Sequence, residues 1–317
     1  MTQTKYDVAV IGGGAAGLSA ALTLGRSRRS VIVIDAGQPR NAPAAGVHGL
    51  FGLEGINPIR LLAQGRAQAE EYGAVIEDGT VDEVTGRAGD FRLALSDRTP
   101  ISARRVLVAS GVADGLPDIP GLADRWGRDV LHCPYCHGWE VRDRAIAVLA
   151  TGPMSVHQAL LFRQLSDDVT YFRHDTAGPD GDDADKLAAR GITVVDGLVA
   201  GIEVTDDRLS GVRLGDGTVI ARQAVVVGTA PVARAGFLAG VGLHPAAHPS
   251  GVGEHIPADP VTGRTAVDGI WVAGNATDLL AQVGAAAAAG AMAAAQINTD
   301  LIADETEEAV ARFRMDR

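Results

Sequence analysis

The chain has 317 residues, of which 46% are apolar and 21% are charged, and its net charge is −11. This composition fits two ordinary domains of a globular protein and lacks the basic surface that nucleic-acid binding requires. The alanine-rich residues 283–297 are too few for a membrane span of ~20 residues, and the N-terminal apolar run is too short for a signal peptide. We therefore expect a cytoplasmic protein without nucleic-acid or membrane partners.

The first predicted elements form a β-α-β unit. Residues 6–11 (YDVAVI) and 30–35 (SVIVID) are near-continuous apolar runs, typical of parallel strands that are covered on both faces. Between them, the glycine loop GGGAAG opens a predicted helix that ends near Leu24.

A second β-α-β pattern follows further along the chain. Two strands and the helix between them are expected at residues 145–150, 169–172 and 156–165. Other strands are expected at residues 105–109, 224–228 and 270–273, and a long helix at residues 283–302. Residues 175–185 are predicted to form an acidic loop, and the Pro/Gly-rich residues 115–121 and 240–259 to link domains.

These elements predict an α/β fold with two Rossmann-like domains, the second inserted in the first. We expect residues 1–115 and 240–317 to form one discontinuous domain. Residues 116–239 would form the inserted domain and carry both cysteines.

The first glycine loop has the pattern of a dinucleotide site. Gly12 permits a tight turn, Gly14 admits a pyrophosphate close to the backbone, and Gly17 lets helix and strand pack. The amides of the helix start would face the phosphates, including those of Ala15 and Ala16. Asp35 could accept hydrogen bonds from a ribose and disfavours a 2′-phosphate, so FAD or NAD fits better than NADP. The alternative is a glycine-rich turn that binds nothing.

The only two cysteines lie in the hexapeptide HCPYCH, residues 132–137. A C-x-x-C pair can form a small-loop disulfide, and it often contains a thiol of lowered pKa. His132 and His137 could stabilise a thiolate or carry its proton. A zinc site is the main rival, but adjacent residues rarely bind one ion and no second ligand pair is present, so we expect no metal. An inert buried pair is the other alternative.

Together these features resemble the low-molecular-weight thioredoxin reductase family, and the likeness covers nearly the whole chain. It rests on GGGAAG, CPYC, and the C-terminal segments WVAGN (residues 271–275) and AQV (residues 281–283). The resemblance implies that the outer domain binds FAD and that the inserted domain carries the redox cysteines and usually binds NADPH. It also implies a homodimer.

The resemblance assigns cofactor-binding roles to four C-terminal residues. Gly274 and Asn275 would meet the ribityl and phosphate region of the flavin. Gln282 and Val283 would present backbone N–H groups to the flavin ring from a helix start, where the dipole favours negative charge. For Gln282 the alternative is an ordinary helix-start residue.

The resemblance assigns three further residues, of which Arg40 and His48 are the weaker match. Val81 corresponds to a position whose backbone contacts the adenine, and Arg40 and His48 lie in the loop that would pass the flavin. For Arg40 and His48 the alternative is that they are ordinary polar surface residues.

The sequence departs from the family in three ways, of which the first two argue against NADPH use. The second glycine loop reads ATGPMS (residues 150–155), in which only Gly152 keeps the pattern and Pro153 removes an N–H donor. Residues 173–175 read RHD and precede the acidic stretch, where the family has a basic cluster for the 2′-phosphate. The usual acid after the second cysteine is replaced by His137.

The segment CPYCHG also resembles the dithiol-oxidase branch of the family, which closes disulfides in natural products such as gliotoxin and holomycin. By this resemblance Cys136 is the flavin-proximal sulfur, Cys133 exchanges with the substrate, and His137 carries the proton. The favoured function is oxidation of a small dithiol with FAD and oxygen or another acceptor. The alternatives are a thioredoxin reductase driven by NADPH or ferredoxin, acting on a thioredoxin-like protein, and a non-catalytic redox sensor.

Overall fold

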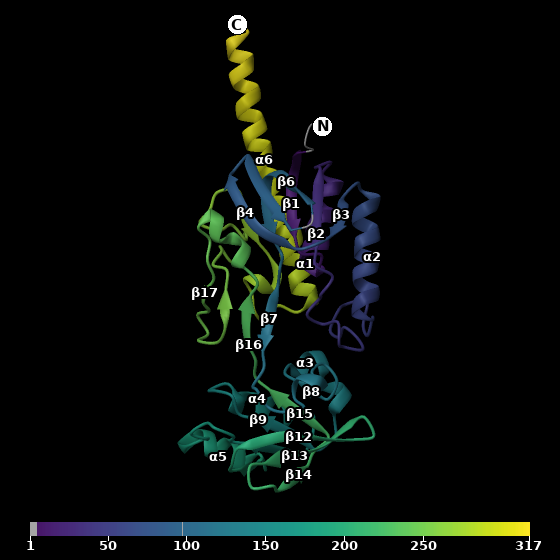
Figure 1. Ribbon diagram of the computed structural model, residues 1–317, viewed down its shortest axis with the longest axis vertical. Helices are drawn as coiled ribbons and strands as arrows, with labels where there is room; N and C mark the ends of the chain where they lie inside the picture. Colours follow the sequence, from purple (N-terminus) through teal and green to yellow (C-terminus); the bar gives the residue numbers. More distant parts are fainter. Residues whose placement is uncertain (1–4, 97) are drawn as a thin grey trace. The chain divides into compact units, whose positions relative to one another are not determined.

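The computed structural model describes residues 5–96 and 98–317, which form two compact units. Unit 1 consists of the described residues of Met1–Ala42, Pro58–Ala113 and Pro231–Arg317, and unit 2 of Pro43–Asn57 and Asp114–Ala230. Strands β7 (Val112–Gly115) and β16 (Ala230–Ala233) carry the chain into and out of the larger part of unit 2 (Figure 1). Unit 2 is therefore inserted in unit 1.

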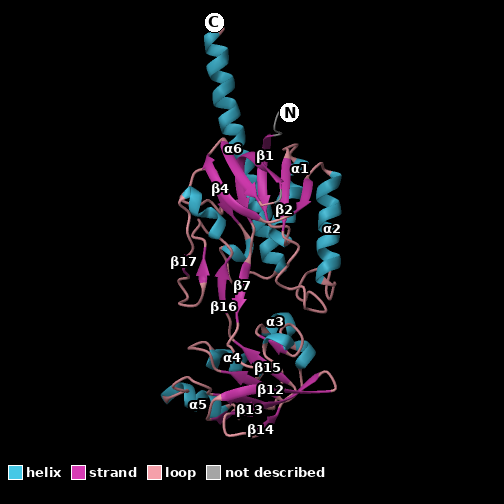
Figure 2. Cartoon of the chain, in the orientation of Figure 1, coloured by secondary structure: helices cyan, strands magenta, loops and turns pink. Residues whose placement is uncertain are grey.

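A seven-stranded sheet forms the centre of unit 1, in the order β3-β2-β1-β6-β5-β4 with β19 also paired to β6 (Figure 2). The strands are β1 (Lys5–Ile11), β2 (Val31–Asp35), β3 (Val75–Asp78), β4 (Val81–Arg87), β5 (Asp90–Leu95), β6 (Arg98–Val108) and β19 (Ile270–Val272). Strands β1, β2, β3, β6 and β19 are parallel, whereas β4 and β5 extend the sheet in antiparallel fashion. A smaller sheet has the order β17-β18-β16-β7, with β17 (Ala246–Ala247) and β18 (Glu254–His255).

Alternating side chains of β1 divide the core of unit 1 into two layers. Val8 and Val10 pack in the layer formed with α1 (Ala15–Arg26) and α6 (Val283–Met315), and α2 (Pro58–Glu71) lies beside α1. Ala9 and Ile11 face the opposite layer, which contains residues of β4, β5 and the 3₁₀ turn η3 (Gly236–Val241). Both faces of the parallel strands are covered, as their apolar runs predicted.

Backbone packs directly against backbone around the first turn of α1. A Cβ at Gly17 would lie 1.9 Å from Gly12 O, and one at Gly290 would lie 2.0 Å from Ala16 O. Gly12 itself has φ 108°, and a Cβ there would lie 2.3 Å from Ala109 O. These positions therefore require glycine, and they hold α1 against both β1 and α6.

The sheet of unit 2 has five parallel strands in the order β11-β10-β9-β15-β8. They are β8 (Val130–Leu131), β9 (Ile146–Leu149), β10 (Val169–Phe172), β11 (Thr193–Val195) and β15 (Ala224–Val227), with helices α4 (Ser155–Phe162) and α5 (Gly181–Ala189) in the connections. A three-stranded antiparallel sheet is formed by β12 (Val199–Thr205), β13 (Arg208–Leu214) and β14 (Val219–Ala221). The structure thus has the expected α/β class with two β-α-β sheets.

Three elements differ from the sequence-based expectation. The acidic loop ends early because α5 begins at Gly181, where Asp182 and Asp183 stabilise the helix N-terminus and Leu187 is buried. Helix α6 continues to Met315 instead of residue 302, because no glycine or proline interrupts its charged second half. The expected linker at residues 240–259 contains β17 and β18.

None of the helices in the described part of the chain combines the length and the apolar character of a membrane span.

We predict that Gly290→Ala destabilises the protein by about 2–3 kcal/mol, because the new methyl group would meet backbone that cannot move aside. The matched control is Gly65→Ala in α2, where the new Cβ would lie 3.3 Å from the flexible Leu18 Cδ1. This control should be neutral or stabilising by up to about 1 kcal/mol. Thermal unfolding of both variants tests the prediction, and equal Tm values would contradict it.

Candidate functional site

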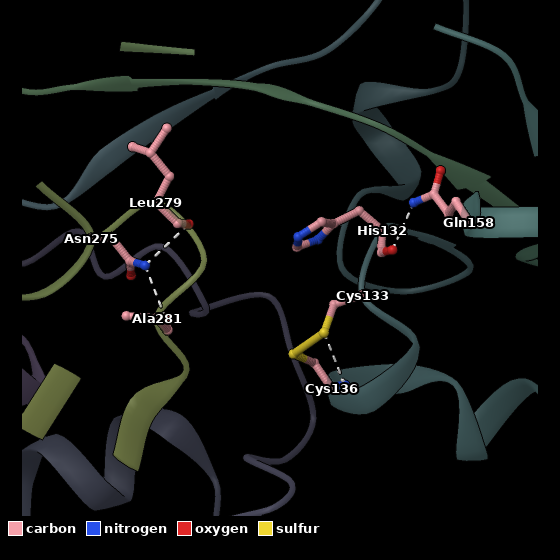
Figure 3. Close-up of a disulfide and its surroundings, with 7 residues drawn as sticks. All are labelled: His132, Cys133, Cys136, Gln158, Asn275, Leu279 and Ala281. Carbon is pink, nitrogen blue, oxygen red and sulfur yellow. Dashed lines mark hydrogen bonds between the residues drawn. A yellow bond between two sulfur atoms is a disulfide. The ribbon is translucent and has the colours of Figure 1, made fainter. Parts of the chain in front are cut away.

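The cysteine motif follows directly after strand β8, at the carboxyl edge of the parallel sheet of unit 2. Cys133 is the N-cap of the short helix α3 (Pro134–His137) and forms a disulfide with Cys136, with Cα atoms 5.3 Å apart (Figure 3). The backbone N–H of Cys136 donates to Cys133 Sγ at 3.2 Å. This N–H would also stabilise a Cys133 thiolate in the reduced pair.

Two contacts fix the position of α3 within unit 2. Gln158 Nε2, from α4, donates to His132 O at 2.7 Å (Figure 3). A Cβ at Gly138 would lie 2.3 Å from both Pro134 O and Leu165 Cδ1, so only glycine fits after the motif. The glycine in CPYCHG was a usable signal for this packing, whereas nothing in the sequence pointed to Gln158.

His137 ends α3 and is partly buried beside the cysteines. Burial lowers the pKa of His137, the carboxylate of Glu140 opposes this effect, and His48 lowers the pKa further. The neutral imidazole is therefore the form present at pH 7, and a neutral imidazole can accept a proton.

The segment Pro43–Asn57 lies with the cysteine motif in unit 2, although it follows β2 of unit 1 in the chain. His48 Nδ1 lies 2.7 Å from Glu54 Oε1, and His48 Nε2 lies 3.5 Å from Glu140 Oε1. Glu54 also accepts from Gly49 N at 2.8 Å. The structure thus places His48 beside Glu140, which follows the cysteine motif, a position that its place in the sequence did not indicate.

The second glycine loop of unit 2 is closed by its own serine. Ser155 Oγ accepts hydrogen bonds from Thr151 N at 3.0 Å and from Gly152 N at 3.3 Å. Pro153 has no N–H to offer. Two backbone donors that would face a pyrophosphate in such a loop are therefore already used within the chain.

The two basic side chains that follow β10, where a 2′-phosphate would be recognised, already have partners within the chain. Arg173 Nε donates to Thr176 O at 2.9 Å, and Arg173 Nη1 lies 3.1 Å from Asp196 Oδ1. His174 Nδ1 accepts from Val199 N at 3.1 Å.

The first glycine loop, in unit 1, is not closed by a side chain, in contrast to the second loop. A Cβ at Gly14 would meet nothing within 4 Å, and no side chain caps α1 at this residue. The backbone amides of Ala15, Ala16 and Gly17 form the first turn of α1, where helix N–H groups have no intrahelical partner. This turn can bind an anionic group such as a pyrophosphate.

Asp35 ends β2 beside this loop, and its carboxylate already has protein partners. Asp35 Oδ1 accepts from Gly37 N at 3.2 Å, and Asp35 Oδ2 accepts from Arg66 Nη2 at 2.9 Å. The backbone of Gly79 donates to Asp35 O at 2.9 Å, which brings the start of β4 at Val81 close to Asp35. Arg66 was not identified from the sequence, because it lies in a polar stretch of α2 without a motif.

The C-terminal candidates lie on one continuous segment that reaches the start of α6. Gly274 has φ 72°, and a Cβ there would lie 3.0 Å from Ala16 Cβ, so this segment packs against the first glycine loop. Asn275 Nδ2 donates to the carbonyls of Asp278, Leu279 and Ala281, which shapes the turn before the helix (Figure 3). Gln282 is the N-cap of α6 and its side chain makes no capping hydrogen bond, so it does not bind the first N–H groups of the helix, among them that of Val283.

The sequence candidates therefore fall into two groups. Unit 1 holds the glycine loop, Asp35, Arg40, Val81 and the C-terminal segment. Unit 2 holds Cys133, Cys136, His137 and His48.

Residues 6–294 match the family described as pyridine nucleotide-disulphide oxidoreductase. The chain is 31% identical over 318 residues to thioredoxin reductase tcpT of Claviceps purpurea (strain 20.1), with 96% of each chain covered. The crystal structure of HlmI is similar with a TM-score of 0.92 and 43% identity, covering 99% of this chain and 98% of that one. An oxidoreductase from Agrobacterium tumefaciens gives a TM-score of 0.88 and 35% identity, covering 94% and 99%.

These likenesses extend over both units and include the cysteine motif, so they confirm the resemblance that the sequence motifs indicated. The chain belongs to the pyridine nucleotide-disulphide oxidoreductase family and is a thioredoxin reductase-like, FAD-dependent disulfide oxidoreductase.

Proposed function

We propose that this enzyme is a dithiol oxidase, in which the pair Cys133–Cys136 accepts electrons from a small dithiol and NADPH is not the electron source. The closed second glycine loop carries this proposal, because Ser155 occupies the amides of Thr151 and Gly152. The 43% identity to HlmI supports it. The resemblance further implies a homodimer, and the sequence composition favours a cytoplasmic location; we include both in the proposal.

The residues of unit 1 fit FAD. The open space at Gly14 and the uncapped first turn of α1 suit the pyrophosphate, and Asp35 has acceptor oxygens for the adenosine ribose. The first turn of α6, at Gln282 and Val283, would present N–H groups to the flavin ring. Bound at these residues, FAD would supply the two-electron acceptor for the cysteine dithiol, with oxygen or another compound as the final acceptor.

The cysteines would oxidise the substrate by two thiol–disulfide exchanges. A substrate thiolate attacks Cys133 Sγ, the bond between the cysteines breaks, and Cys136 leaves as a thiolate. The second thiol of the substrate then attacks the substrate sulfur that is bonded to Cys133 in the mixed disulfide, and Cys133 leaves as a thiolate. The N–H of Cys136 stabilises the Cys133 thiolate and so favours this release. The substrate ends as a disulfide, and its two electrons reside on the cysteine pair.

His137 would accept the proton of the attacking substrate thiol. Its lowered pKa keeps the imidazole neutral at pH 7, so the base is present at working pH. His137 therefore loses its function as a base when the pH falls through this lowered pKa, which is below the ordinary value of about 6.5.

We predict that Glu140→Gln lowers the pKa of His137 further, because it removes the carboxylate that opposes the lowering. Asp143→Asn is the matched control, since it removes an exposed carboxylate nearby and should leave the titration unchanged. NMR titration of the His137 ring measures both variants. A wild-type value at or above 6.5, or no response to Glu140→Gln, would contradict the assigned environment.

We predict that His137→Ala retains FAD but slows flavin reduction by dithiols at pH 7 by about 10²-fold. The defect should shrink towards pH 8.5, where substrate thiols ionise without a base. His157→Ala, which removes an exposed histidine of α4, is the control and should react at the wild-type rate. Stopped-flow reduction under anaerobic conditions gives the rates, and an unchanged rate from pH 6 to 9 would turn attention to His132.

We predict that the purified protein carries FAD and that micromolar NADPH or NADH reduces this flavin slowly or not at all. Each charge-assisted contact to a phosphate contributes about 1.5–3 kcal/mol, so losing two weakens binding by orders of magnitude. Dithiothreitol, which acts directly on the cysteines, is the positive control. Rapid bleaching by NADPH would instead favour the second candidate, a thioredoxin reductase that acts on a thioredoxin-like protein.

A further inference from the structure

Three large aromatic side chains of unit 2 are exposed near the cysteine motif. Tyr135, between the two cysteines, is 68% exposed, and Trp139, in the 3₁₀ turn η2 (Trp139–Val141) that follows α3, is 65% exposed. Phe51, in the segment Pro43–Asn57, is fully exposed. Water hydrates aromatic surface poorly, so a group of exposed rings beside a reactive disulfide indicates a surface that binds a ligand.

The turn that carries Phe51 is held in place by hydrogen bonds and an ion pair. Val47 N donates to Ile56 O at 2.8 Å across an isolated antiparallel bridge, which closes the base of the turn. His48 Nε2 lies 3.5 Å from Glu140 Oε1, and Glu140 is the residue that follows the exposed indole in η2. The turn is therefore attached beside η2, and Phe51 belongs to the same part of unit 2 as the other two aromatic side chains.

The indole of Trp139 is oriented by a neighbouring cation. Arg142 Cζ lies 4.1 Å from the centroid of the indole ring, and Arg142 Nη1 donates to Trp139 O at 2.8 Å. An arginine over one face of the ring fixes its orientation, and most of the side chain still faces solvent. Since the indole and the turn are ordered before a ligand arrives, binding here would cost little side-chain entropy.

The disulfide determines which ligand comes to this surface. In the proposed function a substrate thiolate attacks Cys133 Sγ, so the rest of the substrate lies close to the motif. Tyr135 is in the same helical turn as both cysteines, whose Cα atoms are 5.3 Å apart. The nearby charges of Glu140 and Arg142 already have partners in the chain, so the surface offers the substrate aromatic rings more than charge.

We propose that Tyr135, Trp139 and Phe51 bind an aromatic ring of the dithiol substrate, so that the enzyme prefers aromatic dithiols to aliphatic ones. The inference rests on the proposed function and specifies its substrate class. The exchange itself is unchanged: the two substrate thiols become a disulfide, and two electrons and two protons pass to the protein. Three aromatic side chains suit a small molecule, whereas a standard protein interface takes about 20–30 residues a side.

Anaerobic stopped-flow reduction of the flavin by two matched dithiols tests the preference. 1,2-Benzenedimethanethiol and dithiothreitol close disulfide rings of the same size, and only the first carries an aromatic ring. The dependence of the rate on dithiol concentration gives an apparent Kd and a limiting rate for each compound. The wild-type protein should bind the aromatic dithiol with an apparent Kd about tenfold or more below that of dithiothreitol, because ring contacts add to the burial of apolar area.

Three variants test the assigned side chains. Trp139→Ala should raise the apparent Kd of the aromatic dithiol about tenfold, with a smaller effect on its limiting rate, because the indole would contact the ring and not the reacting sulfurs. Trp139→Phe keeps an aromatic face and should recover most of this affinity. Phe51→Ala should raise the same Kd about threefold or more. Circular dichroism and flavin content show whether each variant is folded.

The matched control is Phe313→Ala in unit 1. Phe313 is 58% exposed and has Arg317 Cζ 4.5 Å from its ring centroid, so it resembles Trp139 in exposure and in its arginine neighbour. It is distant in the chain from the cysteine motif, and its variant should give wild-type values with both dithiols.

The outcomes separate this inference from the proposed function. Equal apparent Kd values for the two dithiols, or a Trp139→Ala variant that raises both values alike, would overturn the inference and leave the proposed function intact. Oxidation of a reduced thioredoxin-like protein faster than of either dithiol, lost in Trp139→Ala, would assign the surface to a protein and also overturn it. If neither dithiol reduces the flavin, the proposed function fails and the inference fails with it.

Discussion

The close backbone contact around the first turn of α1 is the constraint on which unit 1 depends. Gly17 lies against Gly12, and Gly290 of α6 lies against Ala16 of α1, with no space for a side chain at either glycine. The contact brings the N-terminal half of α6 against the glycine loop, and Gly274 packs against the same Ala16. Helix N-termini attract anions, so this packing concentrates positive backbone dipoles at one place in unit 1.

Unit 2 has the same β-α-β architecture, but the amides of its glycine loop are bound by a side chain of the protein. Its loop after β9 corresponds in position to the glycine loop of unit 1, but Ser155 binds the amides that the first loop leaves open. Beside it, Gln158 of α4 supports the cysteine motif through His132 O. The start of α4 thus stabilises a disulfide site, whereas the start of α1 is available to a dinucleotide.

Much of this arrangement could be predicted from the sequence, because motifs are local. The apolar strands, the two β-α-β sheets and the cysteine pair follow from short segments whose chemistry is independent of distant residues. The side-chain partners that come from distant parts of the sequence could not be predicted in this way. Arg66 reaches Asp35 from α2, and His48 reaches Glu140 across 92 positions of sequence, and neither pair has a spacing that marks it. Helix α6 was also predicted too short, because its second half is rich in charged residues and departs from the alanine-rich pattern of the first half.

The position of His48 bears on how protons could be handled at the cysteines. His137 has a lowered pKa because of burial, and Glu140 opposes this lowering while it also contacts His48. Glu54 lies on the other nitrogen of the His48 ring. Carboxylates and imidazoles therefore alternate in the series Glu54, His48, Glu140 and His137. The effect of Glu140 on His137 is a Coulombic interaction. An aspartate in place of His137 would be ionised at pH 7 and would be a weaker base towards a thiol than a neutral imidazole.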